Sequence, residues 1–109
     1  MESSDATVER YVVAARLRPG AAAAAEELLS AGPPFDPAEA GFTGHAAYLG
    51  DEFVYLVFEG PAARSKAQGL ARRHPVEVAR WQTVTRDLPT RVAEVPPAAR
   101  RLYGWPPDG

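Results

Sequence analysis

The chain has 109 residues, which is enough for one compact domain and too few for two. Its 12 Lys and Arg residues against 14 Asp and Glu residues give a net charge of −2, without the basic field of a nucleic-acid-binding protein. The absence of cysteine excludes disulfides, thiolate metal sites and thiol nucleophiles. No apolar run approaches the roughly 20 residues that a membrane helix needs. We therefore expect a cytoplasmic domain with neither nucleic acid nor membrane among its partners.

The first part of the chain predicts a strand, a helix and a loop. Residues 7–18 alternate as a strand does, and Pro19 and Gly20 end it. Residues 21–31 favour a helix, because Leu side chains fall on one side and Glu side chains on the other. Residues 32–41 are too rich in proline for regular structure, so we expect a connection that covers the domain as a lid.

The clearest elements are two β-rich runs, residues 42–49 and 53–59, which predict a hairpin. Gly50-Asp51 suits a two-residue type II′ turn, because glycine tolerates the first position of that turn. This turn predicts that His45 lies opposite Leu56. The alternation puts these two residues on one face of the hairpin and Tyr48 and Tyr55 on the other.

Both faces of this hairpin are mostly apolar, although an antiparallel sheet usually exposes one polar face to water. Helices of the same chain can cover one face. We expect a second copy of the chain to cover the other, so that the protein is a homodimer. The pattern leaves open which face forms a pocket and which forms the interface.

The second part predicts two helical stretches and a short strand. Residues 61–73 favour a helix with proline at its start, His74-Pro75 interrupts it, and residues 76–88 favour a further helix. Residues 90–95 predict a last strand. The order strand, helix, strand, strand, helix, strand is the α+β, ferredoxin-like split βαβ plan.

We therefore place the single domain at residues 1–95 and a tail at residues 96–109. The tail contains Leu102-Tyr103-Gly104-Trp105, and large aromatic side chains seldom remain in water. We expect it to dock on the domain or on a partner subunit.

His45 is the main candidate for chemistry, because it lies in the middle of a strand on a face of Leu, Val, Ala and Phe. A histidine there could titrate near neutral pH and move protons to or from an enclosed ligand. The alternative is a core histidine that one hydrogen bond satisfies. We expect Tyr48, Tyr55 and Trp81 to line a substrate pocket or donate hydrogen bonds in it.

His74 is a second candidate. It either binds the substrate or caps the carbonyl groups of the preceding helix. The neighbouring Arg72 and Arg73 are either solvated or positioned to steer an anionic carrier, so an acyl carrier protein is a candidate partner. The two histidines cannot by themselves form a convincing metal site, and no glycine-rich phosphate loop follows a strand. We expect neither metal nor cofactor.

Several short motifs follow one another along the whole chain. They are the strand end at Arg18-Pro19-Gly20, Gly41 before the second strand, the acidic turn Asp51-Glu52, the third-strand end at Glu59, His74-Pro75, and Tyr103-Gly104-Trp105. In this order and spacing the sequence resembles the small polyketide cyclases of the tetracenomycin F2 cyclase type. The resemblance implies a dimeric α+β barrel that acts on aromatic polyketides.

The chain departs from that family at its suspected catalytic positions. The family has a carboxylate after the first helix, an arginine in the second strand and a histidine in the third. Gly32, His45 and Leu56 hold those places here. The resemblance therefore implies a pocket with a lone imidazole.

We expect a cofactor-free polyketide cyclase or cyclase/aromatase in the biosynthesis of aromatic polyketides such as antibiotics. An apolar pocket would hold a polyketide intermediate for aldol-type ring closure and loss of water, with His45 moving the proton. One alternative is a quinone-forming monooxygenase that needs no cofactor. Those enzymes resemble this architecture but often use an asparagine, and the chain has none. Another is a dimeric module that binds an intermediate without turnover.

Overall fold

The computed structural model describes residues 8–106. Residue 7 of the expected first strand and residues 107–109 of the expected tail lie outside this part. The elements in chain order are β1 (Glu9–Arg16), α1 (Ala22–Ser30), β2 (Gly44–Leu49), β3 (Phe53–Gly60), α2 (Ala63–Arg73), α3 (Pro75–Gln82), β4 (Thr90–Val92) and β5 (Arg100–Trp105).

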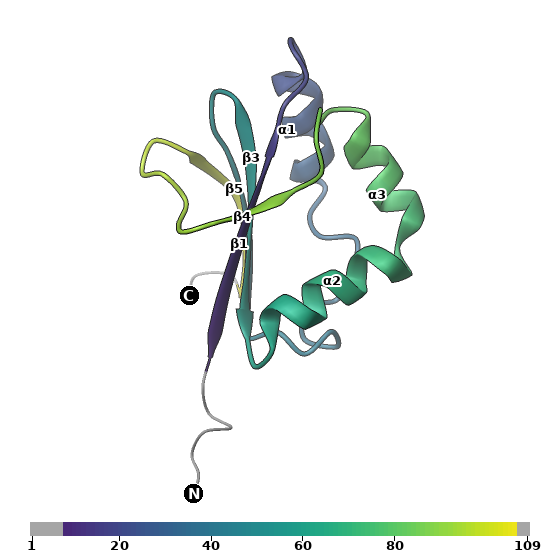
Figure 1. Cartoon of the computed structure of the whole chain (residues 1–109), viewed down its shortest axis with the longest axis vertical. Coiled ribbons are helices and arrows are strands. Elements are labelled where there is room, and N and C mark those ends of the chain that lie inside the picture. The colour runs from purple at the N-terminus through teal and green to yellow at the C-terminus, as the bar shows by residue number, and fades with distance from the viewer. Residues whose placement is uncertain (1–7, 107–109) are drawn as a thin grey trace, which may run out of the picture.

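The strands form one antiparallel sheet in the order β4-β1-β3-β2-β5. All three helices lie on one side of this sheet, and the connection from β4 to β5 runs on the other side (Figure 1). The fold is α+β and is compatible with the ferredoxin-like plan, to which β5 adds an edge strand next to β2.

The register of the central hairpin differs from the predicted one by two residues. His45 pairs with Phe58, whereas the sequence pattern placed it opposite Leu56. The amide of Gly50 donates to the carbonyl of Phe53 over 2.9 Å, so the turn is Asp51-Glu52 and Gly50 belongs to the ladder. A shift of two residues leaves every side chain on its predicted face, because strand side chains alternate with a period of two.

The last helix is shorter than the predicted residues 76–88, since α3 ends at Gln82. The hydroxyls of Thr83 and Thr85 donate to the carbonyls of Arg80 and Trp81 over 2.6 and 3.0 Å. Such bonds compete with helix continuation, as expected for β-branched hydroxyl residues. Across residues 8–106, no helix is both long and apolar enough to cross a membrane.

The predicted last strand, residues 90–95, is only Thr90–Val92, and residues 93–99 cross the sheet on the side away from the helices (Figure 1). Arg10 holds this crossover: its Nε donates to Glu94 over 2.9 Å and its Nη1 to Glu59 over 2.6 Å. The bond from Arg10 is the main cause that lowers the pKa of Glu94 to about 2. The crossover carries the chain from one edge of the sheet to the other, where β5 pairs with β2.

The core on the helix side consists of two clusters of buried residues. The first contains Tyr11, Val13, Phe42, Phe58, Ala63 and Leu70. The second contains Leu17, Ala25, Leu29, Ala47, Val54 and Val84. Leu56 packs against both clusters, so the middle of β3 lies where they meet.

Candidate functional site

His45 is the second residue of β2, with its side chain on the helix side of the sheet, and only 3% of its surface is exposed. Its ring stacks on Phe58 with centroids 4.7 Å apart, and Phe35 and Tyr103 lie 5.1 and 5.3 Å away. His45 is therefore a polar group enclosed by aromatic rings.

Both nitrogens of the His45 ring have partners. Nδ1 lies 2.8 Å from the carbonyl oxygen of Val57, and Nε2 lies 2.7 Å from the hydroxyl of Tyr103. A carbonyl oxygen can only accept, so Nδ1 carries the proton. Neutral imidazole then has a lone pair on Nε2, which accepts the Tyr103 O–H. The geometry thus assigns both the tautomer of His45 and the direction of the Tyr103 bond.

Burial keeps this pair neutral. It lowers the pKa of His45 from its usual 6.5 to about 4, although the bond to the Val57 carbonyl raises the pKa in part. Burial also raises the pKa of the Tyr103 hydroxyl well above its ordinary range. At neutral pH the site is therefore an uncharged hydrogen-bonded pair.

A bulge in β5 places Tyr103 beside His45. Ala47 pairs with Tyr103 and the next residue of β2, Tyr48, pairs with Arg101, so Leu102 is an extra residue in the ladder. Bulges re-aim side chains in this way. Leu102 and Tyr103 both pack against the second core cluster. The sequence predicts that these aromatic residues dock, but it does not predict that Tyr103 lies beside His45.

The proline-rich loop covers the other side of His45. Its Phe35 is half-buried and packs edge-on against Phe42, with centroids 6.1 Å apart. The Nζ of Lys66 donates to the carbonyl of Gly41 over 2.9 Å and anchors the loop to α2. Phe35, the only aromatic residue of the loop, was not singled out from the sequence.

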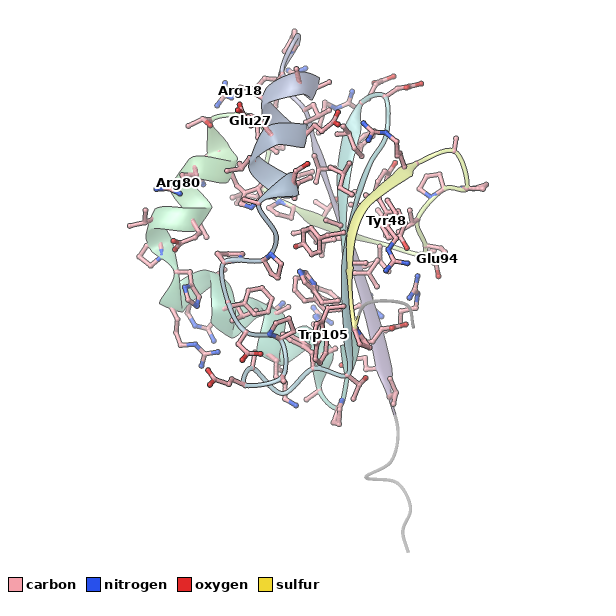
Figure 2. The ribbon with its side chains drawn as sticks, turned by 180° about the vertical axis from the view of Figure 1, so that it is seen from behind. Arg18, Glu27, Tyr48, Arg80, Glu94 and Trp105 are labelled. Carbon is pink, nitrogen blue, oxygen red and sulfur yellow. The ribbon has the colours of Figure 1, made fainter. Side chains whose placement is uncertain are left out.

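Tyr48 and Tyr55 are paired with each other across β2 and β3. Figure 2 shows Tyr48 on the side of the sheet that faces away from the helices, next to Glu94 of the crossover. The structure thus separates these two predicted pocket residues from His45 by the thickness of the sheet.

Trp81 and His74 have different surroundings. Trp81 of α3 is half-buried and packs against the second core cluster, as Tyr103 does. His74 lies between α2 and α3, with Nδ1 3.7 Å from Glu77, and it takes no part in the His45 site. Of the predicted pocket residues, only Trp81 lies on the same side of the sheet as His45 and in the cluster that Tyr103 joins.

Two surface depressions lie elsewhere. One, of about 270 Å³, lies between the end of β1, the start of α1 and the β2–β3 turn. Another, of about 380 Å³, lies between α1 and α3. Neither is lined by His45 or by the half-buried Tyr103. Because His45 itself is buried and Phe35 covers its ring, a ligand reaches His45 only if a covering element such as the Phe35 loop moves.

Within residues 8–106, no group of three or more His, Asp or Glu side chains could hold a metal ion. Comparison with protein-family models, curated proteins and solved structures found no match to the chain. The site is therefore interpreted from its own geometry.

Stability should depend on pH through His45. Between pH 6.5 and about 4 the unfolded chain binds a proton at His45 that the folded chain does not, so lowering the pH favours unfolding. We expect a loss of about 3 kcal/mol in the free energy of unfolding across this window, with no contribution from His45 to the slope above it. Urea denaturation at a series of pH values measures this.

Two variants separate this effect from the carboxylates that also titrate at acid pH. His45→Leu should remove the extra slope, whereas His74→Gln, which removes the other histidine, should retain it. Equal slopes in the wild type and His45→Leu would contradict the assignment.

Proposed function

We propose that the protein is a cofactor-free polyketide cyclase that closes a ring in a poly-β-ketone or a partly cyclised aromatic intermediate. The observation that carries the proposal is the half-buried Tyr103, whose hydroxyl lies 2.7 Å from neutral His45 among aromatic rings. The resemblance of the sequence to small polyketide cyclases adds to it.

In this proposal Tyr103 contacts the substrate and His45 stands behind it. The Tyr103 oxygen takes the α-proton of the substrate as its own proton passes to Nε2 of His45. The carbanion attacks a ketone held nearby, and the relay runs backwards to protonate the new alkoxide. Loss of water then gives the aromatic ring. We expected His45 to touch the substrate, but in this proposal it positions Tyr103, accepts its proton and returns that proton.

Enclosure supports the chemistry. Folding a flexible chain so that the carbon and the ketone touch supplies much of the rate advantage of an intramolecular reaction. In this proposal the side chains of Phe58, Leu56 and Trp81, which pack in the core on the helix side, would form apolar walls that suit an aromatic product. In this proposal the Phe35 loop is the lid that admits the substrate.

A second candidate function is a binding module that holds the intermediate without turnover. The low pKa of His45, about 4, favours it, because such an imidazole is a weak base. In this case the pair would donate and accept hydrogen bonds to a bound polyketide.

The proposal includes a homodimer that forms an α+β barrel through the free side of the sheet. Phe53, Tyr55 and Tyr48 are half-buried there, and the rings of Phe53 and Tyr55 lie 6.2 Å apart. The crossover of residues 93–99 lies on this side, and a second copy would cover the aromatic surface beside it.

Light scattering tests the dimer. The expected mass is twice the 11.7 kDa of one chain, and Tyr55→Glu should give monomers because it puts a charge into the interface. Leu88→Glu, at a residue 70% exposed in the segment before β4, is the matched control and should remain dimeric. A monomeric wild type at working concentration would contradict the dimer.

Ring closure tests the enzyme. With the polyketide product of a minimal synthase as substrate, Tyr103→Phe should slow product formation by about 100-fold or more, as loss of a proton-transfer group does. Tyr48→Phe alters the same type of residue on the opposite side of the sheet and should retain turnover. Chromatography of the aromatic product measures both.

Three results would contradict parts of this account. Loss of turnover in Tyr48→Phe but not in Tyr103→Phe would move the pocket to the other side of the sheet. Unchanged turnover in both variants would remove the assigned relay. Tight binding of the intermediate with no turnover in the wild type would favour the binding module.

A further inference from the structure

The charges of the chain are unevenly distributed. Five of the 12 Lys and Arg residues, but only one of the 14 Asp and Glu residues, lie in α2 and α3. These consecutive helices form the outer layer of the molecule (Figure 1). An acidic protein therefore presents one basic surface.

Several arginines elsewhere in the fold form ion pairs. Arg10, Arg16 and Arg100 each pair with a glutamate. The exposed arginines of the outer helices have no such partner for their side chains among the described residues. They are Arg64, Arg72, Arg73 and Arg80. Their guanidinium groups are thus not held in ion pairs within this part of the fold, although the carboxylate of Glu9 accepts the backbone N–H of Arg64 over 3.1 Å.

Helix stability does not account for all of these residues. Arg72 and Arg73 lie in the last turn of α2, where cations interact favourably with the helix dipole. Arg64 lies in the first turn, where the same dipole disfavours a cation, and α2 has no acidic residue there. Arg64 and Arg72 are both exposed and eight residues apart, so they lie along the same side of the helix.

An apolar residue lies next to this basic cluster. Val76, the second residue of α3, is 60% exposed, and few large apolar side chains of residues 8–106 are as exposed. It follows Arg72 and Arg73 across the junction of the two helices. Protein interfaces commonly combine an apolar centre with a polar rim.

We infer that the surface of α2 and the start of α3, with Arg64, Arg72, Arg73 and Val76, docks an acidic helix of a carrier protein. This inference rests on the proposed function, because a polyketide chain is delivered on an acyl carrier. Carboxylates of the carrier would pair with the arginines, and an apolar side chain would cover Val76.

The surroundings favour a compact acidic protein over a longer polyanion. The 11 residues of α2 span about 16 Å, which matches a short helix. Outside the outer helices, carboxylates outnumber cations, so an extended nucleic acid or an anionic membrane would meet repulsion beyond this surface.

The test measures binding of a holo acyl carrier protein from an aromatic polyketide synthase by fluorescence anisotropy. Arg72→Glu/Arg73→Glu should weaken binding by about tenfold or more, because like charges then face each other. The control Arg86→Glu/Arg91→Glu changes the net charge by the same amount as Arg72→Glu/Arg73→Glu, but at residues outside the outer helices. It should bind the carrier like the wild type. Val76→Ser should weaken binding without changing charge.

Several outcomes would overturn the docking surface. They are no binding by the wild type, equal losses in the two double variants, or equally tight binding of duplex DNA or of phosphatidylglycerol vesicles. An assay of ring closure with a substrate that is not bound to a carrier separates the proposed cyclase activity from the proposed docking surface. Turnover without carrier binding would remove only the docking surface, and carrier binding without turnover would remove only the cyclase.

Discussion

The hydrogen bond between His45 and Tyr103 is the interaction on which the rest of the site depends. It joins His45 on the inner strand β2 to Tyr103 on the edge strand β5, which lies 58 residues later in the sequence. A buried imidazole nitrogen without a partner would destabilise the fold by about 1–3 kcal/mol, so the bond helps to hold β5 in place. It also orients the Tyr103 hydroxyl, which in the proposed function is the group that contacts the substrate.

The same bond explains why the pair stays neutral. Aromatic rings lie on three sides of His45, and burial among them disfavours an imidazolium, whose Nε2–H would donate to the Tyr103 oxygen in place of accepting its proton. A neutral pair suits a ligand with enolisable ketones, which needs a mobile proton and an apolar surface but no fixed charge. The charged groups lie on other surfaces: Arg10 clamps the crossover on the free side of the sheet, and the arginines of α2 face outwards.

Much of the fold could be predicted from local patterns. The alternation in β2 and β3 correctly placed His45 on one face and Tyr48 on the other, because that assignment needs only a period of two. The register could not be predicted as reliably, since a turn at Gly50-Asp51 and a turn at Asp51-Glu52 both satisfy the alternation. The backbone pairing of Gly50 with Phe53 decided between them.

The candidate site was predicted only in part. His45 stood out as a polar residue in an apolar strand, but its two partners come from Val57 and Tyr103, which the wrong register and the unassigned tail concealed. A bulge at Leu102 determines which side chain of β5 reaches His45, and no local sequence pattern predicts this bulge. Tyr48 and Tyr55 were proposed as pocket residues although the alternation put them on the face opposite His45, and the structure confirms that face.

Nitrogen-15 NMR of the histidine rings at neutral pH tests the account most directly. The account predicts that Nδ1 of His45 carries the proton and that Nε2 resonates as an unprotonated acceptor, and that Tyr103→Phe changes the Nε2 shift. A proton on Nε2 of His45, or an Nε2 shift that Tyr103→Phe leaves unchanged, would contradict the hydrogen bond on which the proposed site rests.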